Sequence, residues 1–175
     1  MMPNRSRKQL ASDTPVQRVY WDACIFLELL AADSDLAKDV AAIWQQAVDG
    51  RVEIYTSELS IAEVVYSTQE QVGRALTNDE ERKIDSLWHP MSPVKLLEIS
   101  RPVLLKAREI KRMSHGKGIK IKEPDGIHLA SAVVHKLAEF HSTDHFSKSA
   151  DKRAELSALI GIKVCPPNAK GLLKF

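Results

Sequence analysis

Short apolar segments with the two-residue periodicity of β-strands alternate along this chain with longer segments of helical periodicity. Strands are expected at 17–22, 52–56, 94–99, 138–143 and 162–165. Helices are expected between them, at 24–31, 34–49, 57–71, 77–89, 102–113, from 125 onward and at 148–160. Because neighbouring parallel strands need a crossover connection, usually a helix, this alternation predicts an α/β domain with a mainly parallel central sheet between helical layers.

Length and composition favour a single domain. The chain has 175 residues, 44% of them hydrophobic and 27% charged, which is enough to bury one core. We expect a flexible basic N-terminal tail over 1–16 and one domain over 17–175. The sequence has no long apolar run for a membrane span or a secretory signal, and its two cysteines are too few for a disulfide scaffold. A cytoplasmic protein that does not associate with membranes is therefore expected.

The charges are distributed unevenly. Residues 19–100 carry fifteen acidic and six basic side chains, whereas residues 101–122 carry eight basic side chains and one acidic. A concentrated basic segment of this kind indicates a local contact with a polyanion, although a well-solvated helix face is the other interpretation.

Four carboxylates fall where the expected sheet would bring them together. Asp22 and Asp144 follow the first and fourth strands, Asp125 lies in the first turn of a helix, and Glu63 lies in the helix after the second strand. Because the carboxyl ends of parallel strands meet at one edge, we expect these groups to gather there. Such a cluster needs a hard divalent cation, Mg²⁺ or Mn²⁺, which can activate a water molecule for phosphoryl chemistry.

Each carboxylate also has a simpler interpretation. Asp125 can be a helix cap, Glu63 can pair with Ser60 in a capping box, and Asp22 and Asp144 can be turn residues. Among the histidines, His128 is expected to have a structural rather than a ligand role, since imidazole favours softer metals.

Four segments, in this order, make the sequence similar to a known family. They are VYWDACIF (19–26), YTSELSIAEV (55–64), EPDGIHLASAV (123–133) and HSTDHFSK (141–148). The chain resembles the PIN-domain family over about residues 17–167, and especially the single-domain bacterial toxin ribonucleases of VapC type. The resemblance implies a three-layer α/β/α, Rossmann-like PIN domain.

The resemblance also implies a metal-dependent endoribonuclease and the residues that form its site. It implies that Mg²⁺ or Mn²⁺ activates a water that cleaves single-stranded RNA, leaving a 5′-phosphate and a 3′-hydroxyl. A cognate antitoxin and a homodimer are the implied partners. The family's catalytic and metal-binding quartet falls on Asp22, Glu63, Asp125 and Asp144, with Thr143 in a supporting position. In the basic segment, the lysines expected to hold the RNA backbone are Lys117, Lys120 and Lys122.

One departure from the family pattern keeps a second function open. Cys24 stands where the family often has a small hydrogen-bonding residue, which puts the support of the metal site in doubt. The alternative is a catalytically inactive PIN-like module that binds RNA or another protein, and a structural homo-oligomer without nucleic acid is a third interpretation. Titration with Mn²⁺ separates the first two, because an inert module has no reason to bind the ion at this edge.

Overall fold

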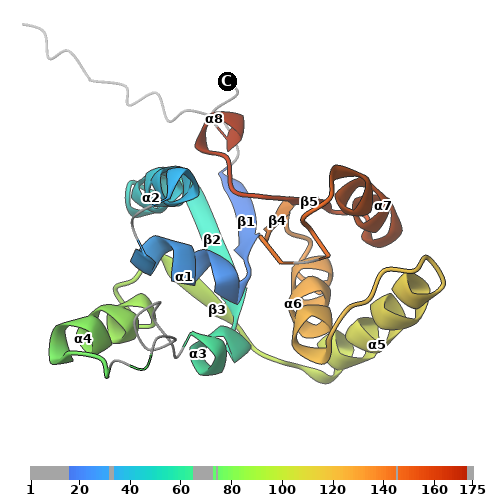
Figure 1. Cartoon of the computed structure of the whole chain (residues 1–175), viewed down its shortest axis with the longest axis horizontal. Helices are drawn as coiled ribbons and strands as arrows, with labels where there is room; N and C mark the ends of the chain where they lie inside the picture. The colour runs from blue at the N-terminus through green and yellow to red at the C-terminus, as the bar shows by residue number, and fades with distance from the viewer. Residues whose placement is uncertain (1–15, 32–33, 65–72, 74, 145, 173–175) are drawn as a thin grey trace, which may run out of the picture.

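Five parallel strands form the centre of the fold in a computed structural model that describes residues 16–31, 34–64, 73, 75–144 and 146–172. The sheet order is β3-β2-β1-β4-β5, and each neighbouring pair is parallel (Figure 1). The strands are β1 Gln17–Trp21, β2 Val52–Ser57, β3 Val94–Leu97, β4 Glu139–His141 and β5 Lys163–Cys165. The prediction of an α/β domain with a mainly parallel sheet is confirmed.

Helices cover both faces of this sheet. Figure 1 shows α1, α2 and α8 on one side and α5, α6 and α7 on the other. The helices are α1 Ala23–Ala31, α2 Asp35–Val48, α3 Leu59–Glu63, α4 Asn78–Leu87, α5 Arg101–His115, α6 Glu123–Val134, α7 Ala150–Ile160 and α8 Ala169–Leu172.

The central strand β1 separates two apolar cores because successive side chains of a strand point to opposite faces. Val19 and Trp21 pack into the core beside α1 and α2, whereas Tyr20 packs into the core beside α5 and α6. All three side chains are fully buried. This two-sided burial accounts for the three consecutive large apolar residues that end β1, and it places Asp22, the next residue, at a fixed point at the edge of the sheet.

Local signals set several helix boundaries as expected. Ser34 caps α2 by accepting a hydrogen bond from the backbone N–H of Ala37 at 2.9 Å. Thr77 and Glu80 form a reciprocal capping box at the start of α4. Gly161, with φ +76°, ends α7 in the left-handed conformation that glycine adopts readily.

Two expected helices differ from the structure, and one helix was not expected. The helix expected over 57–71 is described only as the short α3, which ends at Glu63, and 65–72 lie outside the described residues. The helix expected from Asp125 begins at Glu123, because Pro124 suits a first turn in which its missing N–H costs nothing. No periodicity in the sequence predicts α8, whose Ala169 packs in the core beside α2.

The expected tail lies almost wholly in residues 1–15, outside the described part, so the division at residue 16 stays a prediction. None of the helices within the described ranges is long and apolar enough to cross a membrane.

Candidate functional site

Asp22 lies at the carboxyl end of β1 and is held by hydrogen bonds on both carboxylate oxygens. Its Oδ1 accepts the N–H of Ala23 at 2.8 Å, and its Oδ2 accepts the hydroxyl of Ser142 at 2.9 Å. The backbone N–H of Asp22 donates to the carbonyl of His141 at 3.1 Å, which continues the pairing of β1 with β4. The side chain is almost completely buried. The orientation of this carboxylate is therefore fixed by the ends of two neighbouring strands.

Asp144 and Cys24 lie next to Asp22. Ligand atoms of Asp22, Cys24 and Asp144 all lie within 4.8 Å of one another. Ser142 connects two members of this group, because its Oγ donates to Asp22 and accepts the backbone N–H of Asp144 at 3.1 Å. The expected approach of Asp22 and Asp144 follows from the direct pairing of β1 and β4, whose ends deliver them.

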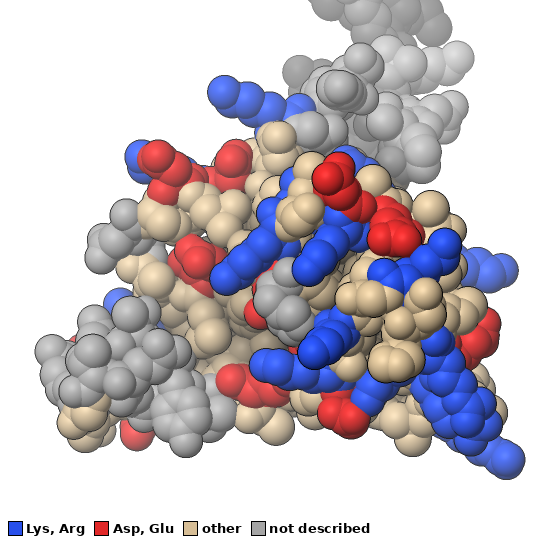
Figure 2. Space-filling model, turned by 45° about the vertical axis from the view of Figure 1, so that its right-hand side comes forward, with Lys and Arg blue, Asp and Glu red and all other residues tan. Residues whose placement is uncertain are grey.

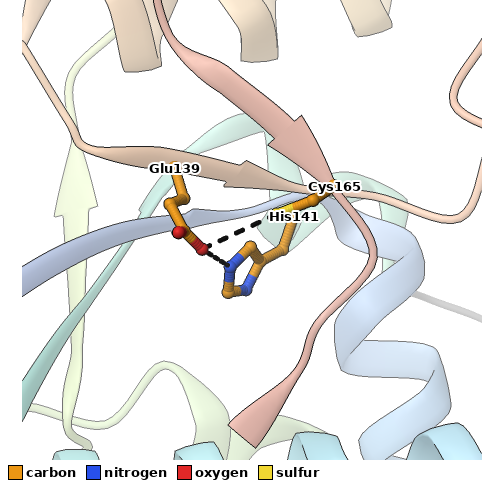
Figure 3. Close-up of side chains that lie close together, drawn as sticks. All are labelled: Glu139, His141 and Cys165. Carbon is orange, nitrogen blue, oxygen red and sulfur yellow. Dashed lines mark hydrogen bonds and ion pairs between the residues drawn. The ribbon is translucent and has the colours of Figure 1, made fainter. Parts of the chain in front are cut away.

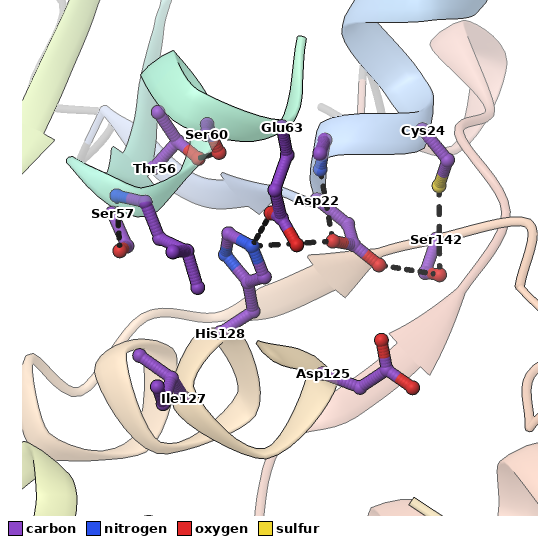
Figure 4. Close-up of polar contacts among 12 residues, drawn as sticks. Asp22, Cys24, Thr56, Ser57, Ser60, Glu63, Asp125, Ile127, His128 and Ser142 are labelled. Atoms are coloured by element: carbon purple, nitrogen blue, oxygen red, sulfur yellow. Dashed lines mark hydrogen bonds and ion pairs between the residues drawn. The ribbon is translucent and has the colours of Figure 1, made fainter. Parts of the chain in front are cut away.

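Glu63 reaches the site through a buried histidine. The carboxylate of Glu63 lies 2.5 Å from Nε2 of His128, and the same nitrogen lies 3.8 Å from Oδ1 of Asp22. On the other side of the ring, Nδ1 of His128 lies 2.6 Å from the hydroxyl of Tyr20, which accepts the backbone N–H of Ser57. A neutral ring that accepts from Tyr20 carries its proton on Nε2 and donates it to Glu63. Figure 4 shows Glu63, His128 and Asp22 side by side, joined by these contacts.

This contact decides between two interpretations of Glu63. The capping box with Ser60 is wrong, because Ser60 lies inside α3 and its hydroxyl pairs with Thr56 at 2.6 Å. The Glu63 side chain instead points toward His128 and is 28% exposed.

Asp125 lies in the first turn of α6 and has two roles there. Its Oδ2 accepts the backbone N–H of Lys122 at 3.3 Å, so the capping interpretation holds for this residue. Its charge also acts on Asp22, whose pKa it helps to raise. Capping and membership of the acidic site are thus compatible, because a carboxylate at a helix N-terminus is stabilised by the helix dipole.

The buried carboxylates create an electrostatic demand for positive charge. Burial raises the pKa of Asp22 above its usual value, and the charge on Asp125 raises it further, while His128 and hydrogen bonds oppose the change. Burial would lower the pKa of His128, but the hydrogen bond that its ring donates to Glu63 and the charge of Asp22 raise the pKa above the ordinary value. The donor chemistry fits a hard divalent cation, since carboxylate oxygens are the ligands that Mg²⁺ and Mn²⁺ prefer.

Cys24 supports the segment that carries Asp144. Its Sγ accepts the backbone N–H of Thr143 at 3.3 Å and lies 3.7 Å from the hydroxyl of Ser142. Burial, followed by the charge of Asp22, raises the pKa of Cys24 to about 12. A neutral thiol thus does the hydrogen bonding here, and Thr143 lies beside the site through its contact with Cys24.

The basic segment lies on α5 and on the loop that leads into α6. Lys117, Lys120 and Lys122 are exposed, whereas Lys106 and Lys111 pair with Glu109 and Glu123 respectively. Figure 2 shows Lys and Arg side chains gathered over this side of the molecule, with carboxylates between them. Lys122 directly precedes the helix that carries Asp125, so this basic surface borders the acidic site.

Two residues of the site have contacts that the sequence did not indicate. His128 was expected to be structural, but it links Glu63 to Asp22, and Ser142 was not singled out although it contacts Asp22 and Asp144. The spacing of His128 three residues after Asp125 placed both near the start of one helix, but only the packing of α6 against the sheet shows which carboxylates the ring contacts.

Comparisons with known proteins agree with this fold. The family model described as PIN domain matches residues 19–152, well over half of the chain. A search of curated proteins found no match.

Solved structures of bacterial proteins share the architecture. FitAcB from Neisseria gonorrhoeae is 18% identical with a TM-score of 0.58, and the match covers 85% of this chain and 97% of that one. VapBC2 from Rickettsia felis is 11% identical with a TM-score of 0.58 and the same coverage. VapC20 from Mycobacterium tuberculosis is 10% identical with a TM-score of 0.53, covering 81% of this chain and 94% of that one. These likenesses concern the fold, and with the family match they show that the chain belongs to the PIN domain family.

Proposed function

We propose that the protein is a metal-dependent endoribonuclease that cleaves single-stranded RNA. PIN domains are generally nucleases that use divalent metal ions. The observation that carries the proposal is the close pair formed by the buried Asp22 and the partly buried Asp144, whose ligand atoms lie within 4.8 Å of each other. Glu63, which is hydrogen-bonded to His128, lies next to this pair. Two carboxylates this close, one of them buried, are costly without a cation, so the arrangement is more consistent with a metal centre than with a turn.

In this proposal, three of the acidic side chains hold the metal ion and the fourth orients the attacking water. Asp22, Asp125 and Asp144 would hold Mg²⁺ or Mn²⁺, with Ser142 fixing the orientation of Asp22. When bound, such an ion supplies Lewis-acid stabilisation of phosphoryl oxygens and a water of lowered pKa. Glu63, oriented by His128, would accept a hydrogen bond from the attacking water. This hydrogen bond would direct a lone pair of the water oxygen toward the phosphorus.

The test is cleavage of an end-labelled single-stranded RNA with Mn²⁺, with EDTA, and with the Asp125→Asn variant. We expect cleavage with Mn²⁺, none with EDTA, and a rate at least about a hundredfold lower in the variant, because removing one charge weakens the hold on the cation. Glu123→Gln is the matched control, since Glu123 lies in the same helical turn but is 81% exposed and pairs with Lys111.

Three results of this cleavage experiment would contradict parts of the proposal. Wild-type rates in Asp125→Asn would contradict the assignment of this carboxylate. Absence of both cleavage and Mn²⁺ binding in the wild type would favour the inert RNA-binding or protein-interaction module. A 2′,3′-cyclic phosphate among the products would contradict attack by water and point to attack by the ribose 2′-hydroxyl.

We expect the lysines beside the site to bind the RNA backbone. Replacing Lys117, Lys120 and Lys122 together by alanine should reduce the slope of log K against log salt by about 2, at roughly 0.7 per phosphate contact on a single strand. A triple alanine variant of Lys38, Lys83 and Lys170, which lie on α2, α4 and α8, is the control and should keep the wild-type slope. An unchanged slope in the first variant would exclude these lysines from RNA binding. Fluorescence anisotropy over a salt series measures the effect.

We also propose that the protein is the toxin of a toxin–antitoxin pair and forms a homodimer. The similar structures include VapBC2 bound to a DNA fragment from its promoter, and VapC20 is described as a toxin that cleaves the sarcin–ricin loop. Light scattering should give about twice the chain mass of 19.6 kDa, and a bound antitoxin should suppress cleavage. A monomeric mass would contradict the dimer without touching the nuclease.

A further inference from the structure

A second group of metal-ligating side chains lies on β4 and β5, apart from the acidic site. Glu139 and His141 are two residues apart on β4 and so share one face of the sheet. Cys165 on β5 lies in register with His141 and therefore points to the same face. Phe140 and Val164, the residues between, point into the opposite core beside α5 and α6. Figure 3 shows the three side chains directed toward one another.

The donor atoms of these residues meet around one carboxylate oxygen. Oε2 of Glu139 lies 2.9 Å from Nε2 of His141 and 3.6 Å from Sγ of Cys165. One ligand atom from each residue lies within 4.8 Å of the other two. The second oxygen of Glu139 is occupied separately, because Oε1 accepts a hydrogen bond from Nζ of Lys163 at 2.7 Å.

The two separations from the Glu139 oxygen are close to those around a tetrahedral Zn²⁺. With bonds of about 2.0 Å to nitrogen and oxygen and about 2.3 Å to sulfur, tetrahedral donors lie about 3.3 to 3.6 Å apart. The observed sulfur–oxygen distance of 3.6 Å already matches, and the nitrogen–oxygen distance of 2.9 Å needs to open by only about 0.4 Å. The strand backbone can stay in place, since a small change in side-chain torsion provides this movement.

Burial and polarity at His141 also point to a ligand. The side chain of His141 is completely buried, that of Glu139 is 13% exposed, and Cys165 is partly buried. Nδ1 of His141 has no hydrogen-bond partner among the described residues, so it is available to carry the ring proton when Nε2, which faces Glu139, acts as the ligand. A thiolate and a carboxylate would neutralise a divalent cation, leaving the charge of Lys163 on the solvent side.

We propose that Glu139, His141 and Cys165 form a second cation site, which takes Zn²⁺ rather than Mg²⁺. One nitrogen, one sulfur and one oxygen ligand form the mixed donor set that suits a borderline-soft ion, and a solvent molecule supplies the fourth position. The ion displaces one proton from the thiol of Cys165, and the ring proton of His141 moves from Nε2 to Nδ1. The site ties β4 to the edge strand β5 directly before the segment that carries Ser142 and Asp144. It does not depend on the proposed nuclease activity.

Co²⁺ is the probe, because a cobalt–thiolate bond gives a charge-transfer band in the near ultraviolet that oxygen ligands do not give. The full chain, reduced and in excess Mg²⁺ to fill the carboxylate site, is titrated with CoCl₂ and then with ZnCl₂. We expect one equivalent of Co²⁺ to give the band and Zn²⁺ to abolish it. In Cys165→Ser the band should be lost and Co²⁺ binding weakened on the order of a hundredfold or more, beyond what loss of a supporting hydrogen bond costs.

Cys24→Ser is the matched control, because Cys24 is the other thiol of the chain and lies beside Asp22 and Asp144. This variant should keep the band. Glu139→Gln should keep the thiolate band but weaken binding, which supports the site even if Cys165→Ser does not fold. The proposal is overturned if the wild type gives no band, if the band survives in folded Cys165→Ser, or if it disappears in Cys24→Ser.

Discussion

Replacing Asp22 by asparagine is expected to abolish cleavage while leaving the fold intact or more stable. Asp22 is the most buried of the four acidic residues and touches the ends of both β1 and β4. A metal centre contributes several kcal/mol to the transition state of phosphodiester hydrolysis, so its loss should lower the rate by about 10² to 10⁴-fold.

Although Asp22→Asn should lower the cleavage rate, it should not lower the stability of the fold. A carboxyl group whose pKa is raised in the folded state destabilises that state at pH values above the raised pKa, and burial raises the pKa of Asp22. A neutral amide of the same shape removes this cost, keeps the hydrogen bond from Ala23, and can donate to the hydroxyl of Ser142. In EDTA, we expect the free energy of unfolding to be unchanged or higher by up to about 1 kcal/mol.

Urea unfolding in EDTA and the RNA cleavage rate in Mn²⁺ measure the two effects on the same protein. Asp49→Asn is the matched control, because Asp49 lies in the turn before β2, at the opposite edge of the sheet, and pairs with Arg51. It should cleave at the wild-type rate. Loss of cleavage together with a large loss of stability in Asp22→Asn would show that Asp22 is structural, and the inert module would then be the better interpretation.

Replacing Phe140 by alanine is expected to destabilise the domain by about 3 to 5 kcal/mol, the usual cost of removing a buried aromatic ring. Phe140 is completely buried at the centre of β4. Its ring stacks on Tyr20 with centroids 5.2 Å apart and also contacts Phe146. The substitution would leave a cavity between strands β1 and β4 and helix α6. The hydrogen bonds of the sheet fix the strand backbones there, so the surrounding residues cannot fill the cavity fully.

The same substitution should loosen the site, because the Tyr20 ring that loses its neighbour carries the hydroxyl that holds His128. Urea unfolding measures the loss of stability, and two variants bracket it. Phe140→Leu keeps most of the volume and should cost less than about 1.5 kcal/mol, while Met91→Ala, at a side chain 86% exposed, should change stability by no more than about 0.5 kcal/mol. A cost below about 1 kcal/mol for Phe140→Ala would mean that the core around β4 repacks freely.

The sequence predicted much of the site because the signals were local. The position of Asp22 follows from the alternate apolar residues of the strand before it, and the position of Asp125 follows from the start of the apolar helix expected there. The helix over 57–71 was not predicted correctly, since α3 ends where Glu63 turns to His128 and Val64 enters the core. That ending depends on contacts with α6 and the sheet that no periodicity encodes.

By itself, then, the sequence determined the order of strands and helices and the end of the sheet at which the carboxylates lie. Both depend on burial and hydrogen bonding within segments of a few residues, which periodicity and capping residues record. Only the tertiary structure decided the contacts of His128, which reach 65 residues back to Glu63 and 108 back to Tyr20. The tertiary structure likewise brings Glu139 and His141 together with Cys165, which lies 26 residues after Glu139. The register between β4 and β5 sets which of their side chains share a face, and the sequence alone does not show that register.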